Sequence, residues 1–180
     1  MTAKINTRTT LHQGKVFALL TENITLANGA TTAMEFLHHP GAAAIVPLLS
    51  DTRVILIQQY RHALREYIWE IPAGTLDNRE TALTCAQREL IEETGYSAQE
   101  WQKLGEITPA PGCSDEKIHL YLASNLIPAQ QNLDQNEVLS VFEVEFAQAM
   151  EMIFRGEIQD GKTIAGLVLA FQRLKKPYRL

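Results

Sequence analysis

The chain has 180 residues, a formal net charge of −5 and 46% hydrophobic residues, with ordinary amounts of glycine and proline. This composition excludes a disordered or collagen-like chain and favours one compact domain with a small additional element. Two cysteines, Cys85 and Cys113, make neither a disulfide framework nor a zinc-finger spacing. This use of cysteine fits a protein of the reducing cytoplasm.

The charge pattern and the hydropathy argue against nucleic acids and membranes as partners. The chain has 16 lysines and arginines against 21 acidic residues and no basic stretch with interleaved aromatics, so we expect no nucleic acid partner. The N-terminus has no apolar region of the kind found in secretory signals. No apolar run approaches the ~20 residues of a membrane span, and we expect no membrane partner.

The N-terminal segment predicts a small β element. Residues 15–25 and 31–37 have the composition of strands and flank an Asn28-Gly29 turn. Pro40-Gly41 is a natural break. We therefore expect an N-terminal β element over residues 1–38 and a main domain over residues 39–180.

In the main domain, strands are interrupted by helices. Two nearly continuous apolar runs predict a strand pair covered on both faces, 42–49 with 53–60. Further strands are expected at 68–71, 101–108, 117–123 and 138–144. Helices are expected at 79–94 and 146–155, and at the C-terminus, where Ile164, Leu167, Val168, Phe171 and Leu174 form one apolar stripe. This order predicts an α/β fold with a mixed sheet between helices.

The most informative segment is the helix predicted over 79–94. Asp77 followed by Glu80 suggests an N-cap with a capping box, and Gly95 suggests the stop. Three acidic residues, Glu89, Glu92 and Glu93, share one face because their spacings are three and four residues. Such a face is either simply solvated or a site for a hard divalent cation that bridges carboxylates to substrate phosphates.

The spacing of the residues around this face decides between the two interpretations. Gly74 is followed after five residues by Glu80 and after seven more by Arg88-Glu89-Leu90, and the pattern closes with Glu92-Glu93 and Gly95-Tyr96. This segment resembles the Nudix box at every defining position. The resemblance implies a Nudix-like α/β/α sandwich with a mixed sheet, plus the small N-terminal β-sheet element.

The resemblance also implies roles for the residues of the box. Mg²⁺, with Mn²⁺ as an alternative and with two or more ions per site, would be bound by Glu89 and Glu93 with help from Glu92. A backbone carbonyl ligand would lie near Ala73. The remaining residues would be structural: Glu80 and Arg88 would brace the helix, and Gly74 would permit the loop geometry.

Outside the box, the chain resembles the ADP-ribose pyrophosphatase branch of the family. Similar runs are found at 39–48, at 58–61 and at 69–74, and Pro111 lies 16 residues after Gly95, at a place typical of that branch. The loop 110–116 is similar to the loop that carries a catalytic glutamate in the branch. The resemblance implies substrate contacts by Arg61, Pro111 and Gly112 and a catalytic role for Glu116, supported by Glu92.

Several of these residues have a second interpretation. Arg61 is either a solvated charge at a strand end or a bidentate phosphate ligand. Glu116 is an exposed loop acid, a metal ligand or the general base, and the neighbouring Asp115 is the alternative carboxylate. Cys113 lies in the same loop, but no base is placed beside it, and the family needs no covalent step. His38 and His39 point to opposite faces of a strand and are poor candidates for one metal site.

The resemblance implies a Mg²⁺-dependent pyrophosphohydrolase that cleaves ADP-ribose to AMP and ribose 5-phosphate. Two alternatives stay open: the same chemistry on another sugar nucleotide, such as GDP-mannose or ADP-glucose, and a nucleotide-sensing module without catalysis. A cytoplasmic homodimer is expected, because the branch commonly dimerises through its N-terminal sheet and a lone sheet would leave an open edge. The same strands would supply part of the substrate pocket.

Overall fold

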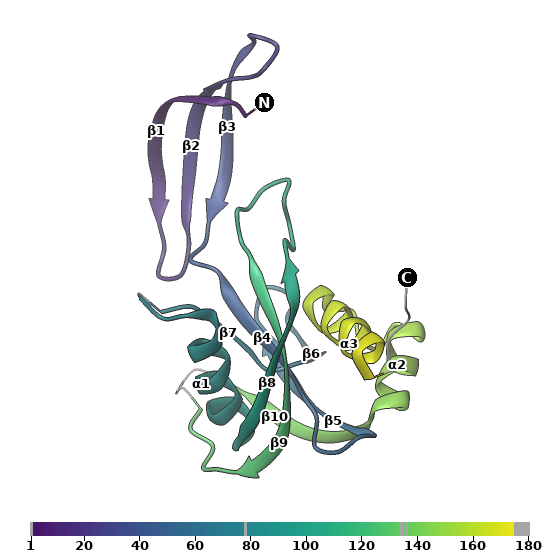
Figure 1. The fold of residues 1–180 in the computed structure, drawn as a ribbon. Helices are drawn as coiled ribbons and strands as arrows, with labels where there is room; N and C mark the ends of the chain where they lie inside the picture. The colour runs from purple at the N-terminus through teal and green to yellow at the C-terminus, as the bar shows by residue number, and fades with distance from the viewer. Residues whose placement is uncertain (1, 78, 134, 136, 175–180) are drawn as a thin grey trace. The chain divides into compact units, whose positions relative to one another are not determined.

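A computed structural model describes residues 2–77, 79–133, 135 and 137–174. The chain forms two compact units, and Figure 1 shows the elements of each. The first unit combines Met1–Gly41 with Thr108–Lys117, and the second combines Ala42–Ile107 with Ile118–Leu180. Among the described residues, no helix is long and apolar enough to cross a membrane.

The first unit is built on an antiparallel sheet in the order β1-β2-β3, formed by Lys4–Gln13, Ala18–Thr25 and Thr31–His38. The predicted turn between β2 and β3 is confirmed, with Gly29 at φ +85°, a conformation that glycine adopts without strain. Sequence reasoning missed β1. All ten of its residues are exposed, so its side chains carry none of the apolar alternation that marks a half-buried strand.

The second unit contains two sheets. One has the order β7-β4-β9-β8, from Ala73–Thr75, Ala42–Pro47, Ile118–Pro128 and Tyr96–Ile107. In it β4 and β9 are parallel and the other neighbours antiparallel, so the predicted mixed sheet is confirmed. The other sheet has the order β10-β5-β6, from Leu139–Glu145, Arg53–Arg61 and Glu66–Glu70. The short strand β7 had not been expected.

The predicted pairing of the two apolar runs is wrong. The run at 42–47 is β4 and pairs with β7 and β9, whereas the run at 53–61 is β5 and pairs with β6 and β10. A single bridge between Leu48 and Val54 joins their ends. Both runs are almost wholly buried, as predicted. Burial on both faces shows that a strand lies inside the fold, but it does not show which strand pairs with it.

Helices cover both faces of the first of these sheets (Figure 1). They are α1 (Ala82–Thr94), α2 (Phe146–Phe154) and α3 (Gly161–Leu174). Because side chains alternate along a strand, β4 feeds two cores. Ala43 and Ile45 pack with Leu90 of α1, while Ala44 and Val46 belong to the cluster that contains α2 and α3. The expected arrangement of a mixed sheet between helices is therefore confirmed.

The predicted apolar stripe of helix α3 faces the core only in part: Leu167 is buried and Ile164 and Phe171 pack against the core, but Val168 and Leu174 are exposed. The buried residues of the helix are Thr163, Gly166, Leu167 and Ala170, and Val168 is 46% exposed. A Cβ on Gly166 would lie 2.8 Å from Cδ1 of Ile71, so this glycine allows the helix to pack close to the start of the loop that precedes β7. A count of large apolar residues could not detect that the small residues Thr163, Gly166 and Ala170 complete this packing face.

Candidate active site

Helix α1 begins later than predicted. It starts at Ala82, and Thr81 is the N-cap, with its side chain accepting a hydrogen bond from the Thr84 N–H at 3.1 Å. Asp77 lies in the preceding turn, where its N–H donates to the Glu80 carboxylate at 3.2 Å. The Glu80 carboxylate therefore stabilises this turn and does not cap the helix. At the other end Gly95, at φ +72°, stops the helix as predicted.

The box carboxylates lie against the chain that leads into α1. Glu93 is 1% exposed, and its Oε2 accepts a hydrogen bond from the Ala73 N–H at 2.8 Å. Its Oε1 is buried and has no hydrogen-bond partner among the described residues. Burial raises the pKa of Glu93 to about 8, against the lowering effect of the Ala73 hydrogen bond. Glu93 thus holds a buried acceptor oxygen that protein donors do not satisfy.

Glu89 lies one turn earlier and faces Gly74. A Cβ on Gly74 would fall 1.7 Å from the Glu89 Oε1, so only glycine leaves room for this carboxylate. The backbone of Gly74 is not in the left-handed region, which means that close approach, and not a special loop geometry, requires the residue. Burial also raises the pKa of Glu89 to about 7, although the Arg88 charge opposes this.

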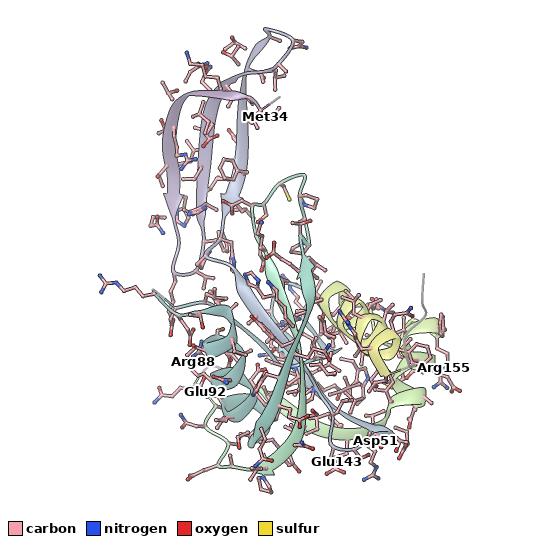
Figure 2. All side chains as sticks on the ribbon, in the orientation of Figure 1. Met34, Asp51, Arg88, Glu92, Glu143 and Arg155 are labelled. Carbon is pink, nitrogen blue, oxygen red and sulfur yellow. The ribbon has the colours of Figure 1, made fainter. Side chains whose placement is uncertain are left out.

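Arg88 donates hydrogen bonds to three carboxylates of the box. Its guanidinium donates to Glu80 at 3.0 Å, to Glu89 at 2.6 Å and to Glu92 at 2.9 Å. The hydrogen bond to Glu80 is the largest cause that raises the pKa of Arg88, and it lowers the pKa of Glu80. Figure 2 labels Arg88 and Glu92 on this helix. Glu92 is the most exposed of the three box carboxylates.

The donor set fits a hard divalent cation. Glu89 and Glu93 are buried and have raised pKa values, Gly74 leaves space for the Glu89 carboxylate, and one oxygen of Glu93 lacks a donor. A cation would compensate these charges, and Mg²⁺ prefers carboxylate oxygens. Within the described ranges no three histidine, cysteine, aspartate or glutamate side chains already converge to hold an ion. Arg88 engages Glu89 and Glu92 in this arrangement.

A second network of charges surrounds Glu70, the last residue of β6. Arg61 donates to both of its oxygens, at 2.6 and 2.7 Å, and Lys162 of α3 binds it as well. Lys162 is in turn 3.0 Å from Asp160. The charge of Glu93 also acts on Arg61 and helps to raise its pKa. Arg61 is thus the partner of a buried carboxylate while its own side chain stays partly exposed at the strand end.

Sequence reasoning missed Glu70, Asp160 and Lys162. Burial alone would raise the pKa of Glu70, but the hydrogen bonds and charges of Arg61 and Lys162 hold it below its usual value. The useful signal was an acidic residue inside the run Trp69–Ile71, because a buried glutamate requires a cationic partner. Its partner Lys162 is 92 residues away in the chain, and no local pattern connects them.

The loop with Pro111, Gly112 and Glu116 belongs to the first unit, whereas the box residues and Arg61 belong to the second. Pro111 and Gly112 are exposed, and a Cβ on Gly112 would meet nothing within 4 Å. The Glu116 Oε1 lies 3.7 Å from Nδ1 of His39. The cysteines are free, and burial raises the pKa of the Cys85 thiol to about 12, which suits a core residue and not a nucleophile.

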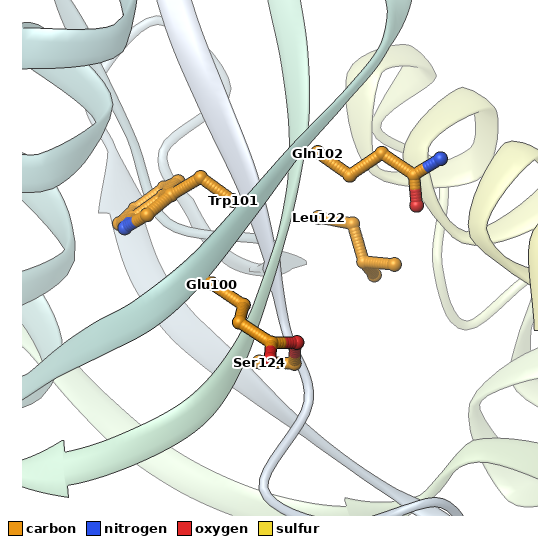
Figure 3. A pocket seen from close by; sticks show the side chains of 5 residues that line it. All are labelled: Glu100, Trp101, Gln102, Leu122 and Ser124. Carbon is orange, nitrogen blue, oxygen red and sulfur yellow. The ribbon is translucent and has the colours of Figure 1, made fainter.

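A hollow on the strands β8 and β9 contains none of the predicted site residues. Figure 3 shows the side chains that line it: Glu100, Trp101, Gln102, Leu122 and Ser124. Its polar groups are engaged locally, since Ser124 donates to Glu100 at 3.3 Å and the Trp101 indole donates to the Ala98 carbonyl at 3.2 Å. The box around α1 is therefore the stronger candidate for chemistry.

Comparison with known proteins identifies the family of this chain. The family described as NUDIX domain matches residues 37–167. An ADP-ribose pyrophosphatase of Bacillus subtilis (strain 168) is 36% identical over 155 residues, which cover 85% of this chain and 84% of the relative. A methanol dehydrogenase activator of Bacillus methanolicus is 35% identical over 156 residues, with 86% and 84% covered. A GDP-mannose pyrophosphatase of Escherichia coli (strain UTI89 / UPEC) is 38% identical over 133 residues, with 69% of each chain covered.

A solved structure has the same fold. It is described as the crystal structure of ADP compounds hydrolase and superposes with a TM-score of 0.86, at 24% identity, over 100% of this chain and 98% of the other. The fold implied by the resemblance is thereby confirmed. With the box residues gathered around α1 and the family matched over most of the length, the chain belongs to the Nudix family.

Proposed function

We propose that this chain hydrolyses ADP-ribose to AMP and ribose 5-phosphate in a reaction that depends on Mg²⁺. The observation that carries the proposal is the buried pair Glu89 and Glu93, with one oxygen of Glu93 left without a donor. Such a pair has the chemistry of a site that binds a cation and, through it, a diphosphate. The relatives named ADP-ribose pyrophosphatase, one from Bacillus subtilis and one from Mycobacterium tuberculosis, point to the substrate.

Each site residue then has a role. Glu89 and Glu93 would hold the metal with help from Glu92, and a backbone carbonyl near Ala73 would complete the set. Bound Mg²⁺, or Mn²⁺ in its place, with two or more ions per site, would neutralise the diphosphate and lower the pKa of the attacking water. Arg88 and Glu80 keep the helix and its preceding turn in place. Glu116 would accept the proton of the attacking water.

Arg61, Pro111 and Gly112 would contact the substrate. Glu70 accepts one N–H from Nε and one from Nη2 of Arg61. Of the five N–H donors of a guanidinium, the two on Nη1 and the second on Nη2 would be the ones offered to phosphate oxygens. The salt bridge would hold the guanidinium plane fixed, which reduces the entropic cost of ordering this side chain when substrate binds.

The N-terminal β element, residues 1–38, would mediate a homodimer and supply part of the substrate pocket. The support is the strand β1, whose ten residues are all exposed and which lies at the edge of its sheet. An open edge strand is a template for pairing with another chain. Sedimentation of the full chain tests this, and a fully active monomer would contradict it. The two free cysteines suit a cytoplasmic location.

A nucleotide panel tests the substrate. ADP-ribose carries no terminal phosphate, so an added phosphatase releases phosphate only after the diphosphate has been cleaved. We expect release with Mg²⁺ and none with a chelator, and a higher kcat/KM for ADP-ribose than for GDP-mannose, ADP-glucose, NADH or diadenosine polyphosphates. Product analysis must give AMP.

The second candidate is the same reaction on GDP-mannose, which a relative named GDP-mannose pyrophosphatase favours. GDP-mannose as the best substrate in the panel would replace ADP-ribose in the proposal. A nucleotide-sensing module without catalysis is the third candidate, and the complete set of Glu89, Glu92 and Glu93 argues against it. Tight nucleotide binding without turnover of any substrate, at any Mg²⁺ concentration, would favour it.

A further inference from the structure

The loop that carries Glu116 is tied to the end of β3. The Leu37 N–H donates to the Cys113 carbonyl at 2.8 Å, and the Asp115 N–H donates to the Leu37 carbonyl at 3.1 Å. Together these bonds make a parallel bridge between Leu37 and Ser114. Segments more than 70 residues apart in the sequence are thereby joined inside the first unit.

The side chain of Asp115 strengthens this connection. One carboxylate oxygen accepts the His39 N–H at 2.8 Å, and the other lies 2.6 Å from Nδ1 of His38. Burial alone would raise the pKa of Asp115, but these two contacts hold it below its usual value. Both oxygens are therefore used, and each is bound to a residue that immediately follows the bridge at Leu37.

Glu116, the next residue, is presented differently. Its N–H donates to the Ser114 hydroxyl at 3.1 Å, which fixes the backbone. The contact of its carboxylate is His39 Nδ1, at 3.7 Å, which is longer than a hydrogen bond. That nitrogen accepts the Gly41 N–H at 3.1 Å, so in neutral His39 the proton is on Nε2. The Glu116 carboxylate is thus held near a ring that does not donate to it through Nδ1.

We propose that Asp115 is a positioning residue: by binding His38 and His39 it clamps the loop 110–117 to β3 and holds Glu116 where its carboxylate can take a proton. The inference rests on the proposed function, in which Glu116 is the base. The clamp also connects the N-terminal sheet to the loop that carries the proposed base, and both belong to the first unit. Asp115 acts through Glu116 and not on the substrate.

A double-mutant cycle in the full-length protein tests the clamp, with kcat measured on ADP-ribose at saturating Mg²⁺. Glu116→Gln should lower kcat by roughly 10²–10⁴-fold, the usual contribution of a positioned base. Asp115→Ala should lower kcat by about 10–100-fold, since small misplacements of a reacting group have effects of that order. In the Glu116→Gln background, Asp115→Ala should cost less than about 2-fold, because there is no base left to misplace.

Two further variants separate positioning from other roles. Asp115→Asn keeps an oxygen for the His39 N–H and offers an amide to His38, so it should restore kcat to within about 3-fold of the wild type. Glu151→Ala removes an exposed carboxylate of α2 and should leave kcat unchanged. Hydrogen exchange supplies the readout apart from activity: Asp115→Ala should speed exchange in 110–117 and 37–39 but not in α1.

The outcomes distinguish the inference from the function on which it rests. Losses that multiply in the double variant would mean that Asp115 acts independently of Glu116 and would overturn the clamp. An unchanged kcat or unchanged exchange in Asp115→Ala would overturn it as well. If wild-type protein hydrolyses ADP-ribose but Glu116→Gln retains full kcat, the base assignment fails and the clamp falls with it. If the wild type hydrolyses no nucleotide, the proposed function itself fails.

Discussion

Two glutamates of the second unit, Glu70 and Glu93, are each 1% exposed, yet their pKa values move in opposite directions. Arg61 and Lys162 compensate Glu70, and its pKa falls. Glu93 receives one backbone hydrogen bond, and its pKa rises to about 8. The comparison teaches that the partners of a buried carboxylate, and not its burial, separate a structural ion pair from a site prepared for a ligand.

The largest expected effect comes from removing the uncompensated charge. Glu93→Gln keeps the size of the side chain and an oxygen for the Ala73 N–H but removes the charge of the carboxylate that we propose as a metal ligand. We expect at least a ~100-fold loss of kcat/KM, because the metal stabilises the transition state by several kcal/mol. The free energy of unfolding without metal should not fall. Activity comparable to wild type at saturating Mg²⁺ would refute the metal assignment.

Removing the compensated charge should instead affect stability. Glu70→Gln leaves Arg61 and Lys162 without their shared anion, and breaking such a buried pair costs about 3 kcal/mol of unfolding free energy. Urea denaturation measures this loss. Glu143→Gln is the matched control. Glu143, labelled in Figure 2, forms an exposed pair with Arg53, and its loss should change stability by less than about 1 kcal/mol. Equal losses in the two variants would remove the contrast between compensated and exposed carboxylates.

A smaller effect is expected from crowding the uncompensated site. Gly74→Ala would place a methyl group where the Glu89 carboxylate now lies. We expect the Mg²⁺ concentration for half-maximal activity to rise about 10-fold, an estimate from the order of effects of displaced metal-site groups. Gly161→Ala is the control, because a Cβ there meets nothing within 4 Å. If Gly74→Ala has wild-type Mg²⁺ dependence, the close approach of Glu89 has no role in metal binding.

The smallest expected effect is on the pH dependence of stability in the metal-free protein. The folded-state pKa values of Glu89 and Glu93 are about 7 and about 8, above the ordinary value of 4.5. Between 4.5 and 8 the folded state therefore binds more protons than the unfolded state, and stability decreases as the pH rises through this window. The melting temperature should fall from pH 5 to pH 8.5, and less so in Glu93→Gln. A melting temperature that rises over this range would contradict the sign.

The chain sequence by itself determined the box and most of the elements. Arg88 and Glu92, and likewise Glu89 and Glu93, lie on one face because helix geometry brings residues four positions apart together, and Gly95 ends the helix by its own backbone preference. The strands other than β1 and β7 carry apolar runs or alternation that a short window records. All of these are local signals, which depend on residues within a few turns of one another.

Only the tertiary structure decided which distant segments meet. The separation of β4 from β5 into different sheets, the binding of Lys162 to Glu70 across 92 residues and the contact of His38 with Asp115 across 77 residues leave no trace in any short window. The first two follow from how buried surfaces pack around the two cores, where a buried charge must find a partner wherever the fold brings it. Spacing in the sequence therefore identified the carboxylates proposed to bind metal, whereas packing decided which of the buried carboxylates lack compensation.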